Sequence, residues 1–421
     1  MLLNRDRTHF LLLNVGHFLD HFFTLIFATV AALALSREWQ LGYADIIRYA
    51  TAGFFAFGLF ALPAGWAADR WNRDGMMVVF FAGIGLASVA CGFAATPTQM
   101  GTGLFVIGAF GAIYHPVGLA IITARWKNTG MRIAVNGVWG NLGVASAALV
   151  TGYFIDHGGW RSAFILPGVF SIALAVVYAQ LRAGDIRARG TGTAVTRTVE
   201  PPLSAEHKTL LLRVSAIVFF TAALSSIVFQ ATTFALPKIF DERLQFLATG
   251  VAHWWQEAGA TGKADVATTV GFFAFLVFAV ASLAQLVAGK LLDRFSARAI
   301  FMGAAAIQVL FFAAMPGLHD GAALAVAFGF MLGAFGQVPI NDYMIGKMAS
   351  GEFRARIYGA RYVVTFTVLA LTLPFVSLVY ERWGFDTLFV ILAVSAALIF
   401  AAVACLPRRL SAPSPVAAQT P

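Results

Sequence analysis

The stretch Gly65-Trp-Ala-Ala-Asp69-Arg70-Trp-Asn-Arg73 joins two long apolar segments near the start of the chain. A degenerate copy, Gly289-Lys-Leu-Leu-Asp293-Arg294-Phe-Ser-Ala-Arg298, joins two more apolar segments 224 residues later. Each copy has a glycine late in one segment, an Asp-Arg pair in the connection and an arginine before the next segment. The copies therefore suggest that the chain contains the same unit twice.

Two further echoes support this repeat. Gly108-Ala-Phe-Gly111 recurs as Gly333-Ala-Phe-Gly336, and Gly159-Trp160 is echoed by Gly384-Phe385, both at an offset of 225 residues. Three echoes in the same order at nearly one offset indicate two similar halves that run in the same direction. Such halves pack about an axis along the membrane normal, with a substrate site between them near the midplane.

The composition places these segments in a lipid bilayer. The hydrophobic share is 59% and the charged share 12%, whereas a soluble domain usually carries about 25% charge. At about 20 apolar residues per crossing, 421 residues leave room for twelve spans. The apolar segments are continuous rather than alternating, so they predict helices. We therefore expect an all-α membrane protein with twelve transmembrane helices in two parallel six-helix repeats.

Helices are predicted near 10–35, 46–68, 76–95, 100–123, 133–155, 162–182, 209–236, 268–290, 298–317, 322–346, 357–380 and 386–406. Residues 1–182 then form an N-terminal bundle, 183–208 a cytoplasmic linker and 209–406 a C-terminal bundle with an external loop at 237–267. Part of that loop is compatible with a surface helix, and the tail 407–421 is expected to be disordered. The first span is longer than the apolar core of a signal peptide. Cys91 and Cys405 lie in apolar segments, which argues against a structural disulfide.

The basic residues predict the orientation. With the N-terminus in the cytoplasm, 21 of the 29 Lys and Arg fall inside and seven outside, while Arg361 lies within a helix. This asymmetry predicts a multi-pass protein of the inner membrane with both termini in the cytoplasm. The net charge of +9 is thus mainly a topology signal, and no nucleic-acid partner is expected.

The G-x-x-x-D-R-x-x-R pattern at Gly65, Asp69, Arg70 and Arg73 resembles the signature loop of the major facilitator superfamily. This resemblance implies a transporter fold that works by alternating access, usually as a monomer. It also implies a gating role for the loop and for Asp293 and Arg294 in its copy. Asp69 would pair with basic groups or a helix N-terminus across the domain interface, in contacts that break when the transporter opens inward.

A second resemblance concerns three motifs of the first half. His17-Phe-Leu-Asp20, Tyr114-His115-Pro116 and Gly140-Asn141-Leu-Gly143 are similar to motifs of the fosmidomycin-resistance group of exporters. Val117 and Gly118 stand where that group usually has polar or acidic residues. The resemblance implies export of a small organic compound.

Polar residues inside the apolar segments indicate the working cavity. Asn14, His17, Asp20, His21 and Thr24 fall within an arc of about 100° on the first helix, between Leu and Phe flanks. A charge at mid-bilayer costs at least ~2.5–3.5 kcal/mol, so this stripe must face protein or water. Proton exchange through Asp20 with His17 or His21 is one interpretation. A buried hydrogen-bond network and direct substrate contact are the others.

Further candidates lie on other helices. His115 precedes Pro116, which loosens the hydrogen-bond ladder of its helix. Asn136 and Asn141 are candidates for the same cavity, and the Gly137, Gly140 and Gly143 row favours close helix packing. In the second half we select Gln337, Asn341 and Arg361, with Arg361 either on an anionic substrate or in an ion pair. Gln230, Gln285 and Gln308 are further possible cavity amides.

Other classes of function find less support. The chain has no P-loop, no nucleophile–base pair and no H-E-x-x-H motif, so we predict neither an enzyme, nor a cofactor, nor a metal site, although His17, Asp20 and His21 resemble metal-ligand spacing. The leading hypothesis is a proton-coupled exporter of a small organic molecule. The alternatives are a proton-coupled importer of an organic acid, with Arg361 on the carboxylate, and a non-transporting membrane sensor.

Overall fold

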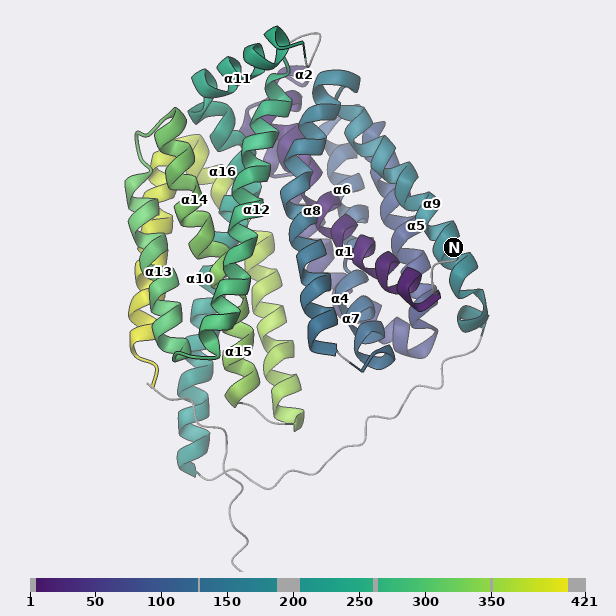
Figure 1. The fold of residues 1–421 in the computed structure, drawn as a ribbon, viewed down its shortest axis with the longest axis vertical. Coiled ribbons are helices and arrows are strands. Elements are labelled where there is room, and N and C mark those ends of the chain that lie inside the picture. The colour runs from purple at the N-terminus through teal and green to yellow at the C-terminus, as the bar shows by residue number, and fades with distance from the viewer. Residues whose placement is uncertain (1–4, 128, 188–204, 260–263, 349–350, 408–421) are drawn as a thin grey trace, which may run out of the picture.

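The computed structural model describes residues 5–127, 129–187, 205–259, 264–348 and 351–407. These residues form helices and short connections, with no strand among them. Figure 1 shows two helical bundles side by side, one from the first half of the chain and one from the second. The halves predicted from the repeat are therefore two bodies that meet along one seam.

The N-terminal half begins with a helix that carries the polar stripe. Its elements are α1 (Arg5–Val30), η1 (Ala31–Leu35), α2 (Ser36–Glu38), α3 (Tyr43–Ile47), α4 (Ala50–Arg70), α5 (Arg73–Gly92), α6 (Pro97–Gly111), α7 (Tyr114–Arg125), α8 (Thr129–Gly158) and α9 (Trp160–Arg187). The π-helical turn η1 continues α1 without a break.

The C-terminal half repeats this plan. Its elements are α10 (Ala205–Arg243), α11 (Gln245–Glu257), α12 (Val266–Leu292), α13 (Ala297–Ala314), α14 (Asp320–Gly336), α15 (Val338–Met348) and α16 (Gly351–Ala404). Among the described residues, eleven segments are long and apolar enough to cross a membrane. The last of them, 38 residues from Thr367 to Ala404, contains the turn at Gly384 and therefore makes two crossings. The structure thus fits the predicted twelve spans.

The echoes in the sequence mark the same structural events in both halves. Gly111 ends α6 and Gly336 ends α14, so the predicted fourth and tenth helices are each broken into two. Pro116 and Pro339 follow these breaks, because a proline clashes with the carbonyl four residues earlier and cannot donate to it. The sequence predicts a loosened helix at Pro116, and the structure places the break just before this proline, at Ala112 and Ile113.

The third sequence echo, Gly159 and Gly384, lies at a turn that favours glycine. Gly159 and Gly384 have φ angles of +74° and +73°, in the left-handed region that glycine adopts at little cost. Gly159 separates α8 from α9, and Gly384 separates the two parts of α16. Both halves therefore make the turn between their last two crossings in the same way.

Two predicted connections are shorter than expected. Residues 183–187 and 205–208 of the predicted linker belong to α9 and α10, while 188–204 lie outside the described residues. The predicted external loop 237–267 is mostly helical, which corrects its description as a loop. Helix α10 continues through Pro237 because Ile239 and Phe240 beyond it are buried. The amphipathic α11 then lies across one end of the C-terminal half, as Figure 1 shows.

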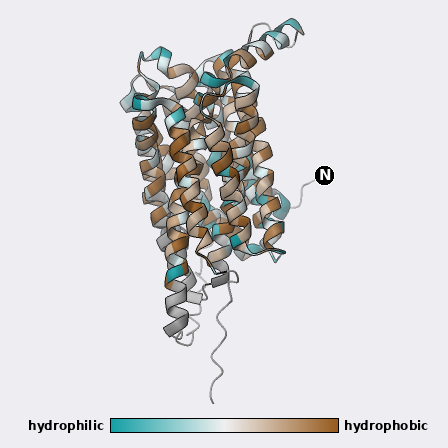
Figure 2. Cartoon of the chain, turned by 90° about the vertical axis from the view of Figure 1, so that its left-hand side faces the viewer, coloured by the Kyte–Doolittle hydropathy of each residue, from teal (hydrophilic) through white to brown (hydrophobic). Residues whose placement is uncertain are grey.

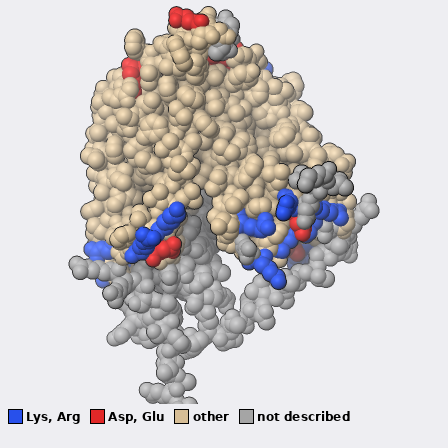
Figure 3. All heavy atoms as spheres, viewed as in Figure 1, with Lys and Arg blue, Asp and Glu red and all other residues tan. Residues whose placement is uncertain are grey.

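Charge and hydropathy divide the surface as a membrane requires. Figure 2 shows apolar ribbon along the middle of the helices and hydrophilic ribbon mainly near their ends. We call the end that holds the α4–α5 and α12–α13 connections, with Arg70, Arg73, Lys290 and Arg294, the basic end. In Figure 3 most of the visible Lys and Arg side chains gather there, and the surface is indented between the two halves. The end that carries α11 is called the opposite end.

The halves hold together at the opposite end. Oδ2 of Asp156, near the end of α8, accepts hydrogen bonds from the backbone N (2.7 Å) and Oγ1 (2.8 Å) of Thr268 at the start of α12. Arg48 donates to Ser377 (2.7 Å) and pairs with Glu381, from the N-terminal to the C-terminal half. These contacts close the seam on that side.

Candidate functional site

The polar stripe of α1 is buried, as the sequence predicts. Asn14, His17 and Asp20 retain 3%, 8% and 1% of their exposure, and His21 is partly buried. Oδ2 of Asp20 lies 3.3 Å from Nε2 of His115. His115 is the second residue of α7, just after the break that separates α7 from α6. The structure therefore brings His115 of α7 to the stripe of α1 that holds His17, Asp20 and His21.

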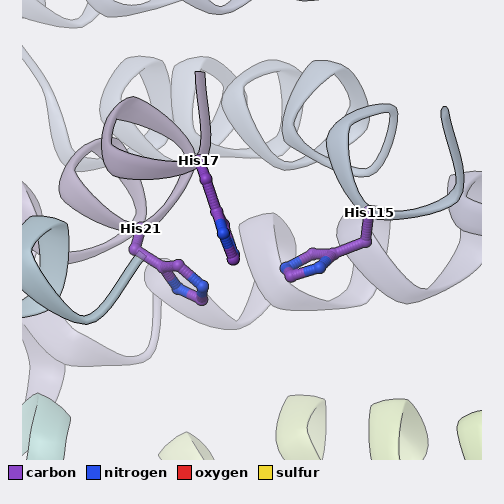
Figure 4. A group of neighbouring side chains, drawn as sticks. All are labelled: His17, His21 and His115. Carbon is purple, nitrogen blue, oxygen red and sulfur yellow. The ribbon is translucent and has the colours of Figure 1, made fainter. Parts of the chain in front are cut away.

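The three imidazole rings converge on one point. Their centroids are 5.0 Å apart for His17 and His21, 5.1 Å for His17 and His115, and 5.5 Å for His21 and His115. One nitrogen of each ring lies within 4.8 Å of a nitrogen of both others. Figure 4 shows the rings pointing toward one another, with helices of the C-terminal half drawn across from them. Two rings come from α1 and one from α7, so only the folded bundle makes the group.

A hydrogen-bond network holds His17 in place. Its Nδ1 lies 2.8 Å from the backbone oxygen of Asn136 on α8. The Asn136 amide donates to Asn14 (3.0 Å) and to the hydroxyl of Tyr114 (2.8 Å), and that hydroxyl donates to the Leu13 carbonyl (2.7 Å). The His17 ring also stacks on Tyr114, at 4.9 Å between centroids. The network ties α1, α7 and α8 together around the ring.

Sequence analysis placed Asn136 near the cavity but missed what it does. His17 and Asn136 are 119 residues apart, and a single sequence carries no signal for their contact. The glycine row on α8 does give a partial signal. A Cβ at Gly140 would lie 2.7 Å from the His17 ring, and one at Gly143 would lie 2.2 Å from the Phe18 carbonyl oxygen. Close packing is thus confirmed at these two positions, whereas Gly137 has open space around it.

An apolar pocket adjoins the histidines. It lies between α1, α4 and α6. Its lining includes Phe23, Phe27, Phe54 and Phe57. The Phe57 ring also packs at 6.2 Å from His115, so the pocket and the polar group share a wall. Phe54 meets Phe234 of the C-terminal half at 6.0 Å.

The other predicted site residues make different contacts where the structure describes their side chains. Asn141 donates to Gln285 of α12 across the seam (3.2 Å), which makes it an interdomain contact. Gln337 is buried and accepts from Gln308 (3.0 Å), and Asn341 is buried nearby in the chain with its Oδ1 unpartnered. Arg361 belongs to α16, but its side chain lies outside the described residues.

The signature loop makes local contacts in this conformation. Asp69 accepts from Arg73 at 2.8 Å, one helical turn later in sequence, and Arg73 is its ion-pair partner among the described side chains. Arg70 lies over the Trp66 ring at 5.0 Å. A Cβ at Gly65 would sit 3.4 Å from Pro116, in ordinary contact, so α4 and α7 are neighbours here without requiring a glycine. Asp293 and Arg294 are exposed at the basic end.

Comparison with known proteins identifies the family to which this fold belongs. The family model described as Major Facilitator Superfamily matches residues 13–255 and 263–421. A gallate transporter of Pseudomonas putida is 27% identical over 147 residues, which cover 34% of this chain and 32% of the relative. The puromycin resistance protein pur8 of Streptomyces alboniger is 32% identical over 173 residues, covering 40% and 34%. The chain thus matches about a third of each relative's length.

A solved structure agrees over nearly the whole chain. The crystal structure of a D-xylose-proton symporter superposes with a TM-score of 0.70 at 11% identity, covering 96% of this chain and 99% of the other. At that identity the likeness concerns the fold, which is the same arrangement of two helical halves.

Proposed function

Because the chain belongs to the major facilitator superfamily, we propose that it is a secondary transporter that exports a small organic molecule by alternating access, driven by protons. The observation that carries this proposal is the polar group of α1 and α7, beside an aromatic pocket and next to a seam closed at the opposite end. A scaffold or sensor has no need to bury such groups within the membrane, where they are costly.

The orientation follows from the charges. The positive-inside rule puts the basic end in the cytoplasm of a cell whose inner membrane holds the chain. The conformation described is then closed to the outside. The side chain of His115 keeps 36% of its exposure, which fits a site reached from the cytoplasm. We assign to the substrate path His17, Asp20, His21, His115, Asn141, Gln337, Asn341 and Arg361.

The side chains around the histidines favour a molecule with both apolar and polar groups. The phenylalanines and aliphatic residues of the pocket wall favour an apolar group, while the histidines and Asp20 beside it favour a polar one. Export is supported by the puromycin-resistance relative and by the resemblance to fosmidomycin-resistance exporters. The gallate-transporter relative favours the second candidate, import of a small aromatic acid.

Protons are the proposed coupling ion. The sequence has no P-loop for ATP. A difference of one pH unit supplies ~1.4 kcal/mol per proton, and 100 mV supplies ~2.3 kcal/mol per charge, either of which supports a tenfold gradient or more. The fold is shared with a D-xylose-proton symporter.

Transport in vesicles tests the proposal. The probe is whichever of puromycin, gallate and related aromatic compounds raises the melting temperature of the purified protein. Everted vesicles with an acidic interior should accumulate an exported probe, and a protonophore should abolish the accumulation. Accumulation only in right-side-out vesicles with an acidic exterior would establish import instead. A bound probe that moves in neither preparation would refute transport.

A further inference from the structure

We propose that His17, His21 and His115 form a binding site for a transition-metal ion of the Zn²⁺ or Co²⁺ class. The three ligand nitrogens already lie within 4.8 Å of one another, and the rings face a common point in Figure 4. Tetrahedral Zn²⁺ holds its nitrogen ligands at about 2.0–2.1 Å, so small side-chain rotations bring three such atoms onto one ion. Nitrogen ligands favour these ions over Mg²⁺ and Ca²⁺, which take oxygen.

The best-placed ligand atom for a metal ion is Nε2 of His17. A carbonyl oxygen only accepts, so the 2.8 Å contact with Asn136 fixes the hydrogen on Nδ1. In the neutral ring Nε2 then carries a lone pair. That atom is buried and has no hydrogen-bond partner among the described residues, in a side chain with 8% exposure. Metal-binding histidines are held in the same way, with the second ring nitrogen donating to a backbone carbonyl.

The surroundings keep this ring in position. Tyr114 stacks on one face of His17, and a Cβ at Gly140 would meet the ring at 2.7 Å. A side chain clamped between an aromatic ring and a helix backbone loses few rotamers when it binds an ion. This preorganisation favours the affinity of His17 for a metal ion. His115 is more exposed, so an ion can enter the site past its side chain.

Asp20 supplies the charge that a dication needs in a low-dielectric interior. Its carboxylate lies 3.3 Å from Nε2 of His115, and both oxygens are buried without a hydrogen-bond partner in the part of the chain that the structure describes. The carboxylate is thus placed either to accept a proton from that imidazole or to join the ligands. Three imidazoles and one carboxylate make a donor set that zinc sites use.

The test is metal binding by the full chain, purified in detergent without a polyhistidine tag and stripped with a chelator. Co²⁺ is titrated while the visible absorption of the nitrogen-coordinated ion is recorded, and Zn²⁺ is then added to displace it. We expect saturation at one ion per chain. His115→Gln and His21→Gln should each weaken binding at least tenfold. Asp20→Asn should weaken it by roughly 10- to 100-fold, as outer partners of metal ligands do.

The matched control is His253→Gln, at an exposed histidine on α11 outside the cluster. Its affinity should equal that of the parent. His115 and His21 are partly exposed, so their variants are expected to keep the parent melting temperature. Absence of saturable Co²⁺ binding in the parent would overturn the proposal, as would equal affinity of His115→Gln and the parent. Binding is measured without transport, so this result and the vesicle result fail or succeed separately.

Discussion

Gly271→Ala is expected to open the seam at the opposite end. A Cβ at Gly271 on α12 would lie 2.3 Å from the Ala148 carbonyl oxygen and 2.8 Å from Cα of Leu149, both in the backbone of α8. Ordinary contact begins near 3.4 Å, so the helices must separate by about 1 Å. Neither obstacle is a side chain that can rotate away.

The size of the effect follows from this clash. Overpacking of a close contact costs about 1–3 kcal/mol. The cost applies only while the halves touch at this end, so it shifts the ratio of closed to open states by about 5- to 150-fold toward open. The helix propensity gained by replacing glycine with alanine, about 1 kcal/mol, applies to both states and cancels.

Electron–electron distance measurements detect the shift. Spin labels at Arg37→Cys and Gln256→Cys, both exposed at the opposite end of different halves, report their separation in a background without Cys91 and Cys405. Gly271→Ala should move the distribution to longer distances. Gly289→Ala on the same helix, where nothing lies within 4 Å, should leave it unchanged. An unaltered distribution in Gly271→Ala would refute the reasoning.

Three other substitutions have defined outcomes. Asp156→Ala removes the acceptor of two hydrogen bonds from Thr268 and should weaken closure by about 1–3 kcal/mol, seen as longer distances between the same labels. Arg182→Ala removes the arginine that holds the largely buried Asp74 carboxylate at 3.1 and 3.0 Å. The Tyr178 hydroxyl still donates to that carboxylate but carries no charge to balance it, so the loss should be about 3–5 kcal/mol, read as a lower melting temperature. Gly384→Ala forces a Cβ into φ +73° and should cost about 1–2 kcal/mol by the same measurement.

Matched control variants separate these specific effects from general destabilisation of the protein. Arg125→Ala breaks an exposed pair with Asp6 and should change stability by less than about 1 kcal/mol. Gly303→Ala introduces a methyl group into open space within α13 and should not destabilise the protein. A loss in Arg182→Ala no larger than in Arg125→Ala would contradict the buried ion pair. Equal melting temperatures of Gly384→Ala and Gly303→Ala would contradict the expected backbone strain at position 384. Unchanged label distances in Asp156→Ala would show that its bonds to Thr268 do not hold the seam.

The sequence predicted the features that depend on local pattern. Long apolar runs predicted the membrane helices, the internal repeat predicted two similar halves, and the signature-loop resemblance predicted the family. The fold and the family are confirmed. The repeat also foresaw corresponding events, since Gly111 and Gly336 end equivalent helices and Gly159 and Gly384 make equivalent turns. The assignment of proton exchange to Asp20 stays a prediction, as does the gating role of Asp69.

Only the tertiary structure decided how the polar residues combine. The stripe on α1 follows from helical periodicity, which one segment contains by itself. The approach of His115 depends on the break after Gly111, which re-aims α7, and the lock on His17 depends on Asn136 more than a hundred residues away. The seam depends on backbone contacts such as Gly271 against Ala148. Contacts between distant segments arise from packing in three dimensions, and a single sequence does not encode them in any local spacing.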